Sequence, residues 1–274
     1  MPVEGADPAE ELNALRRAGA AAIAEGRYAD AEPLVRRALA LAEARLGPDH
    51  IEVAAALNDL GVILKYTARF DEGAAIDARA LAVAGRAGGG ASDLLATICH
   101  NLGGLAHARR DFAAGEPFAR RSVVLRAQAL GPDHVAVAAD LAALAAILDG
   151  QRRFDESVPL HERALAIFTR VHGPDHHEVA VTLGNLAAVR HAEGRLAEAE
   201  NLHRRALATR ERRLGAGHPE VGVNLHNLGG VLRAQGRAAE ALDAHRRALA
   251  IFEARLGAHH PYTAACRKRV DELS

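Results

Sequence analysis

Apolar residues recur along the chain at the three- and four-residue spacing that places them on one face of a helix. Each such stretch is followed by a short turn and a second apolar pattern, so the pattern predicts a series of helix pairs. The first helix of a pair carries a small residue where we expect its partner to approach most closely. Examples are Leu57, Leu60, Gly61 and Leu64 for a first helix, and Ala199, Leu202, Ala206 and Leu207 for a second.

A short segment containing glycine separates each helix pair from the next. Residues 46–50 read Leu-Gly-Pro-Asp-His, and related segments begin at residues 130, 172, 214 and 256, the last three each 42 residues after the one before. Glycine can close a helix in the left-handed conformation, proline cannot continue a helix, and Asp or His can cap the next one. The glycine column is Gly47, Gly89, Gly131, Gly173, Gly215 and Gly257.

A fixed period of this length predicts an all-α stack of repeats without a sheet. We expect one solenoid over residues 1–274, with six repeats and a capping helix at 262–273. The repeats are placed near 12–49, 50–91, 92–133, 134–175, 176–217 and 218–259.

The pattern is broken once, at residues 84–93. There the chain reads Ala-Gly-Arg-Ala-Gly-Gly-Gly-Ala-Ser-Asp instead of a full helical turn followed by Gly-Pro-Asp-His. Glycine costs about 1 kcal/mol per helical position relative to alanine. We therefore expect the second helix of repeat two to end early and this junction to be the most flexible one.

Composition narrows the class of protein. Hydrophobic residues make up 49% of the 274 residues but aromatic residues only 3%, so Ala, Leu, Val and Ile have to build the core. The formal net charge of −1 favours neither nucleic acid nor an acidic membrane surface. Cys99 and Cys266 are expected to be free and at least half-buried. With no secretion signal and no apolar run of about 20 residues, we expect a cytoplasmic protein.

The Leu-Gly/Ala pair of the first helices, the small residues of the second helices and the Leu-Gly-Pro-Asp-His junction resemble the tetratricopeptide repeat (TPR). The 42-residue period resembles the form found in kinesin light chains and their bacterial relatives, over roughly residues 10–260. The chain departs from the family where His161, His203 and His245 replace its usual tyrosine, and where most of its aromatic positions are aliphatic. The resemblance implies a right-handed α-α superhelix, a TPR solenoid.

The resemblance also implies a non-enzymatic scaffold whose first helices line a groove for a protein or an extended peptide. An asparagine in such a groove both donates to and accepts from a peptide backbone. The alternative for these side chains is an ordinary solvated face, and the alternative function is a regulatory or self-assembling module that controls a partner effector enzyme. The candidate groove residues are Asn58, Lys65, His100, Asn101, His107, Asn185, His191, His226, Asn227 and Arg233.

We expect the other histidines and the arginines to have structural roles. The 15 histidines recur at the repeat period, which predicts helix caps and packing residues spread along the stack rather than metal ligands. A column of arginines on the second helices, from Arg37 to Arg247, has acidic residues seven positions earlier, which favours a salt-bridged outer face. No catalytic motif is found. We therefore expect no enzyme, cofactor or metal, and no nucleic-acid or membrane partner, while a homo-oligomer stays open.

Overall fold

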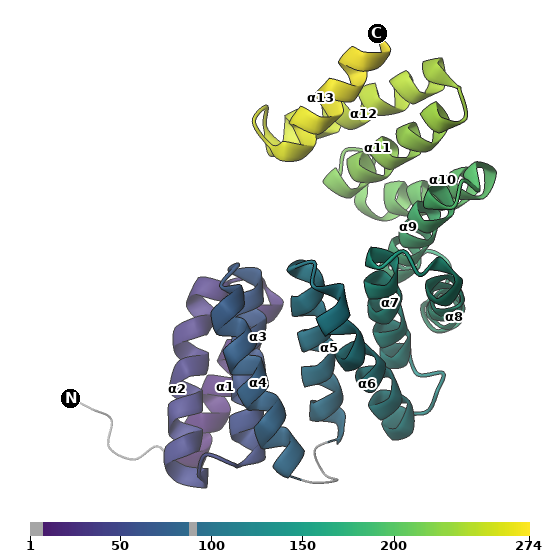
Figure 1. The fold of residues 1–274 in the computed structure, drawn as a ribbon. Coiled ribbons are helices and arrows are strands. Elements are labelled where there is room, and N and C mark those ends of the chain that lie inside the picture. Colours follow the sequence, from purple (N-terminus) through teal and green to yellow (C-terminus); the bar gives the residue numbers. More distant parts are fainter. Residues whose placement is uncertain (1–7, 88–91) are drawn as a thin grey trace. The chain divides into compact units, whose positions relative to one another are not determined.

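The computed structural model describes residues 8–87 and 92–274 (Figure 1). Within these residues the chain forms thirteen α-helices and no strand. No described helix is long and apolar enough to cross a membrane. The helices are α1 (Pro8–Ala24), α2 (Tyr28–Leu46), α3 (Ile51–Tyr66), α4 (Phe70–Arg86), α5 (Ser92–Ala108), α6 (Phe112–Leu130), α7 (Val135–Gly150), α8 (Phe154–His172), α9 (His177–Ala192), α10 (Leu196–Leu214), α11 (Pro219–Ala234), α12 (Ala238–Leu256) and α13 (Pro261–Leu273).

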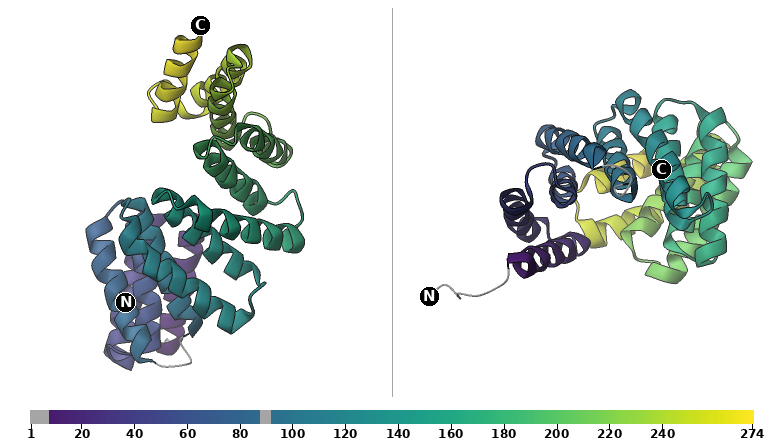
Figure 2. Two further views of the ribbon diagram at one scale, coloured as in Figure 1. Left: turned by 45° about the vertical axis from the view of Figure 1, so that its right-hand side comes forward. Right: turned by 90° about the horizontal axis from the view of Figure 1, so that it is seen from below.

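This order confirms the predicted all-α fold of six helix pairs and a final helix. The residues divide into two compact units, one up to Gln151 and one from Arg152 onward. In the first unit α3 packs on α4 and α5 on α6, and the first helix α5 also contacts the first helices α3 and α7. In the second unit α9 packs on α10, α11 on α12, and α13 covers α12 (Figure 2). The single solenoid over the whole chain stays a prediction.

The core of each helix pair is aliphatic, as the composition requires. Leu57, Leu60 and Leu64 are fully buried on α3, and Leu225 takes the place of Leu57 on α11. From α3 to α11, glycine or alanine follows the leucine equivalent to Leu60 in each first helix, and this small residue lets the second helix of the pair approach closely. The predicted apolar faces of the helices are therefore the ones that form the core.

The junctions have the predicted role, with one difference in backbone conformation. Gly47 ends α2 with φ 87° and ψ 160°, and Gly173 ends α8 with φ 84° and ψ 163°. The expected left-handed helical conformation was wrong for these glycines, because ψ lies in an extended region that essentially only glycine enters. The backbone N–H of Gly47 and that of Gly173 each still donate to the carbonyl oxygen four residues earlier, so the helix ends directly after this bond. Gly89 lies outside the described residues.

The junction histidines are N-caps, as predicted. In each case the histidine has an extended backbone, and its Nδ1 accepts a hydrogen bond from the backbone N–H two residues later, at 3.2–3.3 Å. This bond satisfies one of the free donors of the first helical turn. The capping residues are His50, His134, His176, His218 and His260.

The outer face of the second helices is salt-bridged, as predicted. Arg79 pairs with Glu43 and Arg247 with Glu211, each from the preceding second helix. Glu72, seven positions before Arg79, instead pairs with Arg36 at 2.7 Å. Seven residues span about 10 Å along a helix, so the acidic residues pair with arginines of the neighbouring repeats. These ion pairs connect successive repeats.

The break in the repeat pattern shortens α4 as predicted. The helix ends at Arg86, two residues before the position that corresponds to Leu46 and Leu130. Its last residue is followed by Ala87, without the glycine that closes the other second helices. Residues 88–91 of the expected flexible junction lie outside the described residues, so its flexibility stays a prediction.

Candidate functional site

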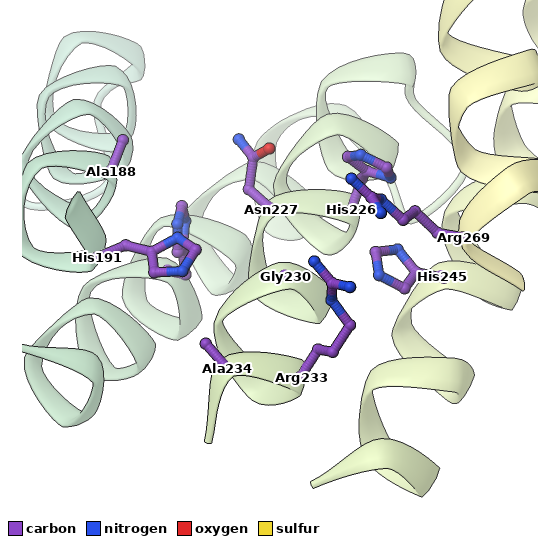
Figure 3. A pocket seen from close by; sticks show the side chains of 10 residues that line it. Ala188, His191, His226, Asn227, Gly230, Arg233, Ala234, His245 and Arg269 are labelled. Carbon is purple, nitrogen blue, oxygen red and sulfur yellow. The ribbon is translucent and has the colours of Figure 1, made fainter. Parts of the chain in front are cut away.

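A cavity of about 490 Å³ lies in the second unit and is lined by residues of the first helices α9 and α11 and of the helices α10, α12 and α13. Its wall is basic or neutral throughout, with two arginines, four histidines and one asparagine but no carboxylate. Figure 3 shows most of these side chains converging on one space. The lining residues are Ala188, His191, His203, His226, Asn227, Gly230, Arg233, Ala234, His245 and Arg269.

Four of the candidate groove residues line this cavity. His226 and Asn227 are neighbours on α11, Arg233 follows two turns later on the same helix, and His191 faces them from α9 (Figure 3). Asn227 and Arg233 are exposed, whereas His191 and His226 are half-buried. Burial and the nearby Arg269 lower the pKa of His226, so its imidazole is neutral at physiological pH. Asn185, on α9, is half-buried but is not among the lining residues.

Two of the lining histidines, His203 and His245, are buried, and they differ in whether the ring has a hydrogen-bond partner. Nδ1 of His203 lies 3.2 Å from Oδ1 of Asn224, and Nδ2 of Asn224 donates to the His203 carbonyl oxygen at 2.8 Å. Burial lowers the pKa of His203 to about 4, although the bond to Asn224 opposes the shift. His203 is therefore a neutral packing residue that connects α10 to α11, as predicted.

His245 occupies the same place one repeat later but lacks such a partner. It is buried, and neither Nδ1 nor Nε2 has a hydrogen-bond partner among the described residues. Burial, His226 and Arg269 lower its pKa to about 4. Cys266 on α13, which corresponds to Asn224, donates its Sγ–H to the His245 carbonyl oxygen at 3.1 Å.

His226, His245 and Cys266 thus form a cluster whose ligand atoms all lie within 4.8 Å of one another. The imidazoles of His226 and His245 have ring centroids 4.9 Å apart. The expectation that the histidines are spread apart along the stack was wrong here. The residues come from consecutive helices, α11, α12 and α13, and only tertiary packing brings them together.

In the first unit, the candidate asparagines bind each other. Nδ2 of Asn101 on α5 donates to Oδ1 of Asn58 on α3 at 2.8 Å. Asn58 is buried and Asn101 half-buried, so this bond links two successive first helices. Its energetic role is to satisfy polar groups at a helix contact, since an unpaired buried amide costs about 1–3 kcal/mol.

His100 belongs to a buried polar network that the sequence did not indicate. Its Nδ1 lies 2.8 Å from Oδ1 of Asp140, a fully buried carboxylate of α7. Nε of Arg126 donates to the other oxygen, Oδ2, at 2.9 Å, and Nη1 of Arg126 donates to Asp93 at the same distance. The network joins α5, α6 and α7, and it fixes the imidazole of His100 within the unit.

Lys65 and His107 are the last two candidates of the first unit. Burial lowers the pKa of Lys65, while the carboxylate of Asp77 opposes that shift. Burial and Lys65 lower the pKa of His107, whose ring meets Phe112 edge-on with centroids 5.5 Å apart. The structure therefore brings candidates of the first unit into pairs and networks, and four of the five candidates of the second unit, all but Asn185, around an open cavity.

The sequence comparisons agree with the repeat pattern. Models of the tetratricopeptide repeat match residues 10–86, 142–212, 179–254 and 220–270, and a second model of the same repeat matches residues 95–136. Repeats of this family generally mediate protein–protein interactions. No significant match to a curated protein is found.

Solved structures with the same fold include BtubC (BKLC) from P. vanneervenii, which is 22% identical with a TM-score of 0.68. The match covers 94% of this chain and 95% of BtubC. A Podosopora anserina protein, described as a kinesin light chain with nearly identical TPR-like repeats, is 22% identical (TM-score 0.56; 64% and 83% covered). The apo form of RapI is 12% identical, with a TM-score of 0.67 and coverages of 96% and 99%. At these identities the likeness concerns the fold.

Proposed function

The chain belongs to the tetratricopeptide-repeat family, and from this premise we propose that it is a non-enzymatic scaffold that binds a protein or extended peptide along its first helices. One observation carries the proposal. Four of the side chains that the family resemblance implies for a peptide groove, His191, His226, Asn227 and Arg233, line one cavity of about 490 Å³.

The chemistry of this wall suits a peptide backbone. Asn227 is exposed and offers a donor and an acceptor together, which matches a peptide unit without reading its side chain. Half-buried His191 and His226 add imidazole nitrogens, and the exposed guanidinium of Arg233 attracts an acidic residue of the partner. With no carboxylate among the lining residues, acidic segments are favoured over basic ones.

The second unit is the more suitable recognition site of the two. In the first unit Asn58 and Asn101 satisfy each other, and His100 is held by buried Asp140. A peptide would have to break these bonds before it could use the same atoms, and each exchange contributes little net free energy. We therefore assign partner recognition to the cavity of the second unit.

The test is affinity capture from the native host with the immobilised full chain. A variant with Asn227→Ala and Arg233→Ala removes two exposed cavity side chains and should lose the proteins that the unmodified chain retains. The matched control reverses two exposed arginines on second helices, Arg163→Glu and Arg205→Glu, and should retain them. Equal retention by all three chains would contradict the proposal, and recovery of nothing but the chain itself would favour the self-assembling module.

A further inference from the structure

We propose that His226, His245 and Cys266 form a binding site for a single thiophilic metal ion, with Cu⁺ favoured over Zn²⁺. The three side chains come from α11, α12 and α13, and their ligand atoms lie within 4.8 Å of one another. The site shares His226 with the proposed peptide groove, but it does not rest on that groove, since neither His245 nor Cys266 is a groove candidate.

The unsatisfied nitrogens of the cluster carry the inference. Both ring nitrogens of His245 and Nδ1 of His226 are buried without a hydrogen-bond partner among the described residues. Buried polar atoms of folded proteins are paired in the large majority of cases, because an unpaired one has lost its hydrogen bonds to water without gaining another. Three buried nitrogens without a hydrogen-bond partner therefore lie in two neighbouring imidazoles, and a bound metal ion would give such nitrogens a partner. The equivalent residue His203 has no such deficit, because Asn224 pairs with it.

The geometry is close to that of a metal centre. Metal–nitrogen and metal–sulfur bonds of about 2.0 and 2.3 Å place the ligand atoms of one ion roughly 3.5 Å apart. To bind one ion, the ligand atoms of the three side chains would have to move about 1 Å closer to one another than the 4.8 Å within which they now lie. Rotation of the side chains can provide this movement. Cys266 would give up its hydrogen bond to the His245 carbonyl oxygen. In this step the Cys266 S–H bond breaks, an S–metal bond forms, and the proton leaves to water.

The donor set and the surrounding charge select the ion. Two imidazoles and a thiolate are soft or intermediate ligands, and the absence of a carboxylate among the cavity-lining residues disfavours Mg²⁺ and Ca²⁺. Arg233 and Arg269 line the same cavity, and Glu272 pairs with Arg269 at 2.7 Å. Because this carboxylate offsets only one of the two charges, added positive charge is costly there. Cu⁺ with one thiolate is a neutral unit and is satisfied by three ligands. Zn²⁺ with the same ligands keeps one positive charge beside two guanidinium groups.

The test uses the metal-free full chain and competition with a chromogenic Cu⁺ chelator under anaerobic conditions, with a parallel Zn²⁺ titration. The unmodified chain should take up one Cu⁺ per chain. Cys266→Ala and His226→Gln should each weaken binding at least about tenfold, since changes even in the outer shell of metal sites cost 10- to 100-fold. Two matched controls should retain binding: Cys99→Ala, which removes the other buried cysteine, and His191→Gln, which removes a cavity histidine outside the cluster.

An X-ray absorption spectrum of the unmodified Cu⁺-loaded chain makes the test independent of how the variants fold. Sulfur and imidazole scatterers around one copper ion are the expected result. The proposal is overturned if the chain fails to compete with the chelator, if the controls lose as much affinity as the cluster variants, or if no sulfur scatterer is found. Tighter retention of Zn²⁺ than of Cu⁺ would overturn the choice of ion.

Discussion

A methyl group on Gly61 of α3 would lie 2.8 Å from Cγ of Asp77 on α4, closer than side-chain atoms approach. Asp77 is fully buried, and its Oδ1 has no hydrogen-bond partner among the described residues. The close approach of the two helices therefore depends on the missing side chain at Gly61. The same relationship recurs in the second unit, where a methyl group on Gly229 would lie 2.8 Å from the ring of His245.

Gly61→Ala should destabilise the first unit by about 1–3 kcal/mol, as overpacking of a close contact does. The matched control is Gly73→Ala on α4. That position is also buried and helical, but an added methyl group would make only ordinary contacts of 3.5 Å and more. Since alanine is the better helix former, the control should be neutral or gain up to about 1 kcal/mol. Urea denaturation distinguishes the two, and equal effects would contradict the close approach.

The carboxyl of Asp77 should make stability depend on pH. Burial raises its pKa to about 7, and the charge of Lys65 only partly offsets this. In the unfolded chain an aspartate has a pKa of about 3.9. Between these values the folded state holds a proton that the unfolded state has lost, so this contribution to stability falls as pH rises from about 4 to about 7. Above that range it is constant.

Asparagine does not titrate, so the variant Asp77→Asn should not lose stability in this way as pH rises. The difference in unfolding free energy between the variant and the unmodified chain should grow from about pH 4 to about pH 7 by up to roughly 4 kcal/mol, the equivalent of a three-unit pKa shift. Denaturation at several pH values measures it. A difference that is the same at all pH values would show that Asp77 is ionised in the folded protein throughout.

The buried carboxylate of Asp140 should contribute far more to the stability of the folded protein than an exposed carboxylate does. Asp140→Ala leaves Arg126 and His100 without their shared partner and should cost about 3–5 kcal/mol. Asp71→Ala, the control, removes a 95% exposed carboxylate that pairs with Arg109 at 3.2 Å, and should cost about 0–1 kcal/mol. Thermal unfolding compares the variants, and similar shifts would argue against the network.

The shortened end of α4 should show in hydrogen exchange. Amides of residues 84–87 should exchange faster than those of residues 126–129, the corresponding positions of α6, which continues to Leu130 before a glycine closes it. The reason is the early end of α4 at Arg86 and the glycine at position 85. Equal protection of the two segments would remove the expected hinge.

The fold could be predicted from the sequence because its local signals recur at a fixed period. Gly47 and His50 each determine a helix boundary through their own backbone and side chain, and the period repeats that chemistry. The site was only partly predictable. Cys266 meets His245 across two helices, and Asp140 meets His100 at a separation of 40 residues. Such contacts depend on how neighbouring helices pack, which no spacing within one helix reveals.

The central claim is that partners bind at the first helices, and the measurement that tests it most directly is a titration of the captured partner. Asn185 and Asn227 occupy equivalent positions on α9 and α11; Asn227 lines the cavity, and Asn185 lies outside its lining on the same first helix as His191. If each contributes one hydrogen bond of about 0.5–1.5 kcal/mol, the double change to alanine should weaken binding about 5- to 150-fold. The control with Arg163→Glu and Arg205→Glu should bind as the unmodified chain does. Unchanged affinity in the asparagine variant, with loss in the arginine variant, would place the site on the outer face and contradict the account.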